Sequence, residues 1–106
     1  PLSELVPHIR ATYPRHLIEV EVCNLGQLTE LLKNPPQRIL LDHFLLAEMK
    51  QAVAMVAGTD IQIEASGNVT LETVKDVAET GVDFISVGAL THSAPCSDFS
   101  LMVASP

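Results

Sequence analysis

Residues 64–93 read EASGNVTLETVKDVAETGVDFISVGALTHS, and this stretch decides the fold of the chain. Its pattern predicts a strand, a glycine turn, a helix, a second strand and a second glycine turn. The first turn is the SGN run at 66–68, and the helix after it is expected to begin at the N-cap Thr70. Gly81 ends that helix. Residues 82–87 are rich in β-branched and aromatic residues and therefore predict the second strand.

The two glycine turns predict a site for an anion. Each turn follows a strand, and parallel neighbouring strands end at the same edge of a sheet. Backbone N–H groups in such turns point at a bound anion. In α/β barrels, turns at the C-terminal ends of adjacent strands usually hold a phosphate group. The alternative is that Gly67 and Gly88 only allow the chain to turn tightly.

The rest of the chain continues the alternation of strands and helices. Apolar patterns predict helices near residues 2–9, 25–32 and 45–56, and strands at 17–22 (LIEVEV), 38–42 (RILLD), 60–65 and 98–103 (DFSLMV). This order predicts an α/β fold with a parallel sheet, forming roughly half of a TIM-like barrel. The last strand follows no helix, so another sheet is an alternative place for it. Half a barrel leaves open edges, and we therefore expect further sequence before Pro1.

Acidic residues lie at the ends of two predicted strands. Glu19 and Glu21 share one face of residues 17–22, and Asp42 ends residues 38–42. A charge is costly in a core but normal at the rim of a parallel barrel, where groups that bind ligands collect. These carboxylates are therefore candidate site residues, although solvent-exposed strand ends would carry them equally well.

The composition excludes several classes of protein. With 106 residues and 47% hydrophobic residues, the chain predicts one globular domain. A net charge of −7 with six Lys and Arg argues against nucleic acid or anionic membrane as partners. The sequence has neither a membrane-spanning run nor a signal-peptide pattern, so a cytoplasmic location is expected. Cys23 and Cys96 are then expected to be isolated thiols.

Four motifs resemble a known family. They are EVEV (19–22), LLDHF (40–44), EASGNV (64–69) and ETGVDFISVGALTHS (79–93). Together they are similar to the C-terminal barrel segment of quinolinate phosphoribosyltransferase over residues 17–103. The resemblance implies phosphoribosyl transfer from phosphoribosyl pyrophosphate to quinolinate in NAD biosynthesis, with release of pyrophosphate and CO₂. It also implies Mg²⁺ and a homodimer or higher homo-oligomer. Residues 1–106 would then be the C-terminal part of the barrel domain, without the N-terminal domain and early barrel.

The resemblance also implies roles for individual residues. Glu21 and Asp42 match the acidic pair that binds the metal and the ribose hydroxyls, and they would be the catalytic residues. The 5′-phosphate would be bound by Ser66, Gly67, Asn68, Gly88, Ala89 and His92. Two departures matter. The family has Asn where this chain has His43, and its basic cluster for quinolinate is absent, so these residues alone are expected to be inactive.

Two other functions remain open at this point. One is a different phosphate-binding βα-barrel enzyme, such as a sugar-phosphate isomerase or aldolase. A catalytic Lys at a strand end would favour it, and the sequence shows none. The other is a non-catalytic module that docks onto a partner through its open sheet edges. His8, His16 and His43 have no second ligand at metal spacing, so they are expected to be surface or packing residues.

Overall fold

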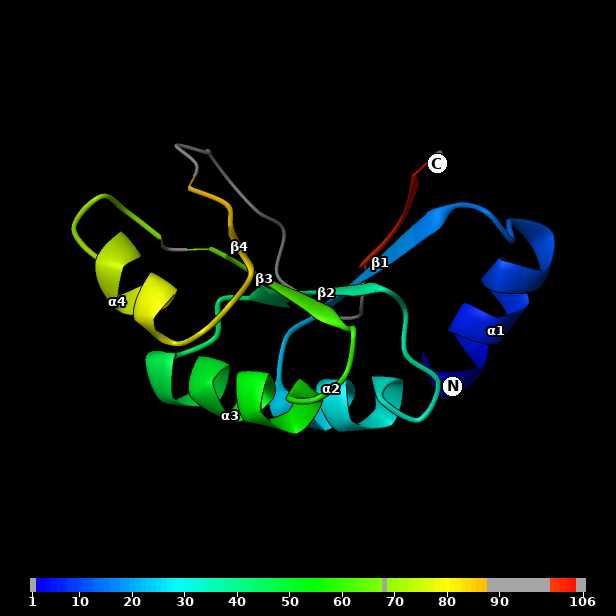
Figure 1. Ribbon diagram of the computed structural model, residues 1–106, viewed down its shortest axis with the longest axis horizontal. Coiled ribbons are helices and arrows are strands. Elements are labelled where there is room, and N and C mark those ends of the chain that lie inside the picture. The colour runs from blue at the N-terminus through cyan, green and yellow to red at the C-terminus, as the bar shows by residue number, and fades with distance from the viewer. Residues whose placement is uncertain (1, 68, 88–99, 105–106) are drawn as a thin grey trace.

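A computed structural model of the chain describes residues 2–67, 69–87 and 100–104. These residues form a five-stranded sheet with the strand order β4-β3-β2-β1-β5, together with helices (Figure 1). The elements are α1 (Leu2–Thr12), β1 (Leu17–Val22), α2 (Leu25–Leu31), β2 (Arg38–Asp42), α3 (Leu46–Val56), β3 (Gln62–Ser66), α4 (Val74–Glu79), β4 (Phe84–Ile85) and β5 (Ser100–Ala104). In the part of the chain that the structure describes, no helix has the length and apolar character needed to cross a membrane.

The first four strands are parallel, which confirms the predicted α/β class. β1 pairs with β2, β2 with β3 and β3 with β4. The last strand does not join another sheet. β5 instead pairs with β1 in the antiparallel direction, with Glu21 opposite Ser100. This pairing gives hydrogen-bond partners to a strand edge that would otherwise be open.

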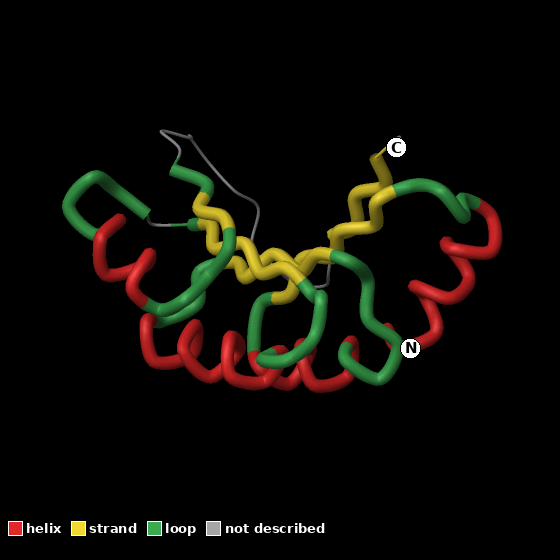
Figure 2. The backbone as a smooth tube through the Cα atoms, in the orientation of Figure 1, coloured by secondary structure: helices red, strands yellow, loops and turns green. Residues whose placement is uncertain are grey.

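Helices α2, α3 and α4 lie along one face of the sheet, and the sheet curves away from them as the wall of a barrel does (Figure 2). Because side chains alternate along a strand, this face carries the apolar half of each strand. The buried strand residues on it are Ile18, Val20, Val22, Ile39, Leu41, Ile63 and Ala65. They pack in one core with helix residues such as Leu28, Met49 and Val77. This core fixes the strands in register and leaves the opposite face for polar side chains.

The opposite, uncovered face carries the other half of each strand. Its residues are Glu19, Glu21, Arg38, Leu40, Asp42, Gln62, Glu64, Ser66 and Phe84. No helix among the described residues covers this face. All the candidate acidic residues therefore lie on the same side of the sheet.

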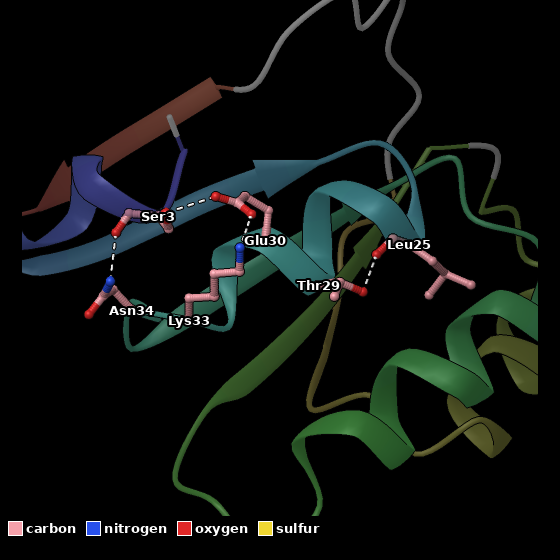
Figure 3. A network of polar contacts seen from close by, with 6 residues as sticks. All are labelled: Ser3, Leu25, Thr29, Glu30, Lys33 and Asn34. Atoms are coloured by element: carbon pink, nitrogen blue, oxygen red, sulfur yellow. Dashed lines mark hydrogen bonds and ion pairs between the residues drawn. The ribbon is translucent and has the colours of Figure 1, made fainter.

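Polar contacts hold α1 against α2 (Figure 3). The Ser3 hydroxyl donates to Glu30 Oε1 (2.8 Å), and Asn34 Nδ2 donates to the carbonyl oxygen of Ser3 (2.9 Å). Lys33 forms an ion pair with Glu30 (2.8 Å), and Thr29 donates to the Leu25 carbonyl oxygen. The two contacts of Ser3 tie the start of α1 to α2 and to the residues that follow it.

Helix α4 begins later than the sequence predicts. Thr70 is not its N-cap, because residues 70–73 form a separate turn in which the Thr73 N–H donates to the Thr70 carbonyl oxygen (3.1 Å). The helix starts at Val74, and Leu71, in the turn before it, is 86% exposed. The predicted end of the helix is confirmed, since Gly81 follows it with φ +98°. A bound anion would therefore be held by the SGN turn itself and not by the helix N-terminus.

Candidate functional site

Glu21 and Asp42 lie close together at the C-terminal ends of β1 and β2, as the sequence predicts. Glu21 is opposite Leu40, and Asp42 follows two positions later on the same face. Both side chains are half-buried. Burial raises the pKa of Glu21, and the charge of Asp42 raises it further, while His43 lowers it. Because the charge of Asp42 opposes the ionisation of Glu21, a cation bound between the two carboxylates would be stabilised.

A third group, Cys23, lies beside the two acids. One ligand atom from each of Glu21, Cys23 and Asp42 fits within 4.8 Å of the others. Cys23 is disulfide-bonded, so the expectation of isolated thiols is wrong for this residue, and its sulfur is not a thiolate ligand. The remaining ligands are carboxylate oxygens. Mg²⁺ prefers oxygen and is commonly held by one or two carboxylates together with substrate phosphates. The residues present therefore fit Mg²⁺.

The SGN turn begins one strand away from these acids. Ser66 ends β3 opposite Asp42. The backbone N–H of His43 donates to the carbonyl oxygen of Ser66 (3.0 Å), which extends the pairing of β2 and β3 into the turn. Gly67 has φ +84°, a conformation that side chains rarely adopt. The turn is therefore held directly beside the acidic pair.

The end of β4 lies beside the same turn. Glu64 is opposite Phe84, and the Ser86 N–H donates to the Ala65 carbonyl oxygen (2.9 Å). The strands that carry the two glycine turns are thus neighbours, as the sequence predicts. Of the predicted phosphate-binding residues, Asn68, Gly88, Ala89 and His92 lie outside the described residues, and their places in the site stay predictions.

His43 was expected to be a surface or packing residue, but it lies between the acids and the turn. Its backbone has φ 58°, which makes it the non-glycine residue with positive φ among those described. Its Nδ1 is 2.9 Å from Asp42 Oδ1. A Cβ placed on Gly67 would lie 2.7 Å from the same nitrogen. The sequence gives one indication that His43 belongs to the site, which is that it directly follows Asp42 at the end of a strand.

A second polar cluster lies deeper on the uncovered face, towards the N-terminal ends of the strands. Arg38 is 3.9 Å from Glu64 in an ion pair, donates to Gln62 Oε1 (3.3 Å) and lies 4.1 Å from the centre of the Phe84 ring. Glu19 is 6% exposed, and its Oε1 has no hydrogen-bond partner among the described residues. Burial, followed by the hydrogen bond with Glu64, raises the pKa of Glu19 to about 7. This cluster thus lies on the same face of the sheet as Glu21 and Asp42, nearer the N-terminal ends of the strands.

The sequence matches a known protein family over nearly its whole length. A family model described as the C-terminal domain of quinolinate phosphoribosyl transferase matches residues 2–102. A nicotinate-nucleotide pyrophosphorylase (carboxylating) of Mycobacterium leprae is 40% identical over 95 residues, which is 88% of this chain and 34% of that protein. The chain thus spans about a third of the length of the curated relatives that it matches.

Solved structures agree with the sequence comparison. A nicotinate-nucleotide pyrophosphorylase from Francisella tularensis superposes with a TM-score of 0.77 at 33% identity, covering 96% of this chain and 37% of that one. The corresponding structure from Ehrlichia chaffeensis gives a TM-score of 0.75 at 35% identity, covering 95% of this chain and 36% of that one. The chain therefore belongs to the quinolinate phosphoribosyltransferase family and matches its C-terminal domain.

Proposed function

We propose that this protein transfers a phosphoribosyl group from phosphoribosyl pyrophosphate to quinolinate, with decarboxylation to nicotinate mononucleotide. The observation that carries the proposal is the position of Glu21 and Asp42 beside the Ser66–Gly67 turn. One place on the uncovered face thus combines ligands for a divalent cation with a turn suited to phosphate. Relatives that match the chain have names that describe this activity, nicotinate-nucleotide pyrophosphorylase and quinolinate phosphoribosyltransferase.

The chemistry needs charge stabilisation and positioning more than a nucleophile. Departure of pyrophosphate leaves positive charge on the ribose ring, and the carboxylates of Glu21 and Asp42 stabilise that charge. The same two residues would hold Mg²⁺, which supplies positive charge to the leaving pyrophosphate. The backbone of the Ser66–Gly67 turn holds the 5′-phosphate, so the sugar lies across the ends of β1 to β3.

Other parts of the proposal extend beyond the described residues. Asn68, Gly88, Ala89 and His92 complete the phosphate site, and residues 1–106 form the C-terminal part of the barrel domain. The protein acts in the cytoplasm as a homodimer or higher homo-oligomer. These statements rest on the resemblance of the sequence to the quinolinate phosphoribosyltransferase family.

Quinolinate needs basic groups that this face does not offer. Of the six Lys and Arg, Arg38 is the one that lies on the uncovered face, and it is paired with Glu64. The two carboxylates of quinolinate are therefore bound by groups outside the 106 residues, and the segment alone is inactive.

The test is the substitution Asp42→Asn in the natural-length protein that contains residues 1–106. Asn keeps the size of the side chain but removes the charge, so kcat/KM with quinolinate, phosphoribosyl pyrophosphate and Mg²⁺ should fall by about 100-fold or more. Asp60→Asn is the matched control, because Asp60 is exposed in the loop before β3, remote from the acidic pair. Its activity should equal that of the wild type.

Two results would refute the proposal. The first is a wild-type protein that releases no CO₂ from carboxyl-labelled quinolinate. The second is an Asp42→Asn variant that keeps wild-type turnover and a wild-type circular dichroism spectrum. Turnover of a sugar phosphate by a wild type that ignores quinolinate would instead favour the isomerase or aldolase alternative.

A further inference from the structure

His43 contacts both halves of the proposed site. We propose that His43 is a positioning residue that fixes the Asp42 carboxylate and the Ser66–Gly67 turn relative to each other. The inference rests on the proposed function for what the two halves bind, which is Mg²⁺ at Asp42 and phosphate at the turn. It assigns a role to His43, the position at which the family has Asn.

The backbone of His43 gives the first contact. Its φ of 58° is in the left-handed region, which is strained for a residue with a Cβ. Such strain persists only where the surroundings impose it. Here the His43 N–H donates to the Ser66 carbonyl oxygen (3.0 Å), directly after the pairing of Asp42 with Ser66. The strained residue is thus anchored to the strand that leads into the turn.

The imidazole ring gives the second contact. Its Nδ1 is 2.9 Å from Asp42 Oδ1. A carboxylate oxygen accepts hydrogen bonds, so the Nδ1–H tautomer of His43 is the one that donates to Asp42. This bond restricts rotation of the carboxylate. Groups that orient a metal ligand in this way typically change metal affinity by about 10- to 100-fold when they are removed.

The same ring lies against the turn. A Cβ built on Gly67 would be 2.7 Å from His43 Nδ1 and 2.8 Å from Cε1 and Cγ. The ring therefore occupies the space that the missing side chain of Gly67 leaves. A single side chain is packed on the phosphate turn and hydrogen-bonded to the metal-binding acid, so losing it should weaken the binding of both ligands.

Two substitutions in the natural-length protein separate these contacts. His43→Gly removes the ring and fits the left-handed backbone without strain. His43→Asn also tolerates that backbone and keeps a donor for Asp42, but it is too small to cover Gly67. His8→Asn, on an exposed position of α1, is the matched control. Isothermal titration with Mg²⁺ gives metal affinity, and steady-state kinetics give kcat and the KM for phosphoribosyl pyrophosphate.

His43→Gly should raise the Mg²⁺ Kd about tenfold or more and raise the KM for phosphoribosyl pyrophosphate more than it lowers kcat. His43→Asn should restore most of the Mg²⁺ affinity while the KM stays high. The thermal stability of His43→Gly should equal or exceed that of the wild type, because the substitution relieves backbone strain, so unfolding would not explain the losses.

Three outcomes would overturn the positioning role. They are an unchanged Mg²⁺ Kd and KM in His43→Gly, equal Mg²⁺ Kd values for His43→Gly and His43→Asn, and a wild type that does not bind Mg²⁺. A wild type that binds Mg²⁺ and loses affinity in His43→Gly, yet does not turn over quinolinate, would refute the proposed function and leave the role of His43 in place.

Discussion

Replacing Gly67 with Ala should destabilise the protein by two separable effects. The first is backbone strain, because φ at this position is +84° and a Cβ there costs about 1–2 kcal/mol. The second is a clash, because the new Cβ would lie 2.7 Å from His43 Nδ1. Overpacking of this kind typically costs about 1–3 kcal/mol. We therefore expect Gly67→Ala to lower the free energy of unfolding by about 3 kcal/mol.

Gly58→Ala is a matched control for the strain alone. Gly58 has nearly the same φ, +82°, but a Cβ placed on it meets nothing within 4 Å. Its substitution should therefore cost only about 1 kcal/mol. The difference of about 2 kcal/mol between the two variants measures the contact of Gly67 with the His43 ring.

Urea unfolding followed by circular dichroism gives both values in the natural-length protein. The double variant His43→Gly with Gly67→Ala removes the ring, so the additional loss caused by Gly67→Ala should fall to the value measured for Gly58→Ala. Equal losses in Gly67→Ala and Gly58→Ala would refute the reasoning, because the ring would then not be held against the turn.

The polar cluster around Arg38 gives two further predictions. The raised pKa of Glu19, about 7 against 4.5, means that the folded protein holds this proton more tightly than the unfolded chain, so stability should fall as the pH rises between these values. Glu19→Gln should remove that decline and stabilise the protein by on the order of 2 kcal/mol at about pH 8. Urea titrations at about pH 5 and 8 give the free energy of unfolding at each pH, and a variant whose free energy still falls as much as that of the wild type would contradict this. Arg38→Met should destabilise by about 1–2 kcal/mol, because Glu64 loses its cation and Phe84 its stacked guanidinium. Arg38→Lys should lose less than Arg38→Met, and an equal or larger loss in calorimetry would argue against a charge-based role.

Local patterns in the sequence predict most of the fold. The strands at 17–22 and 38–42 have the predicted bounds, because alternating or continuous apolar residues between turn signals leave little choice. Asn24, a residue type that favours N-caps, precedes α2, and its Oδ1 accepts from the Gln27 N–H (2.8 Å). Such features depend on neighbouring residues only, so they can be predicted without the rest of the structure.

The start of α4 could not be predicted because two threonines compete for the same role. Thr70 and Thr73 both have hydroxyls suited to capping. In the structure, the N–H groups of Glu72 and Thr73 donate to the Thr70 hydroxyl, within a turn that precedes the helix. The predicted strand 82–87 is likewise shorter, with ladder pairing only at Phe84–Ile85. The start of α4 is thus decided by local hydrogen bonds that either threonine could make, and the length of β4 is decided by its pairing with β3.

The candidate site was predictable where it depends on strand order and unpredictable where it depends on side-chain contacts. Adjacent parallel strands place Glu21 near Asp42, and that follows from the alternation of strands and helices. The role of His43 requires the backbone conformation and the pairing of Asp42 with Ser66. The disulfide of Cys23 was also missed, since two distant cysteines give no spacing pattern.

The pairing of β5 with β1 has a consequence for how the chain folds. The paired residues are about 80 positions apart, whereas β1, β2 and β3 are joined by short βα connections. Contacts between distant segments form slowly because a long loop must close first. The parallel strands should therefore assemble early and β5 should dock last. Until it docks, one side of β1 presents free N–H and C=O groups, and this interval is when a second nascent chain can pair with it and aggregate.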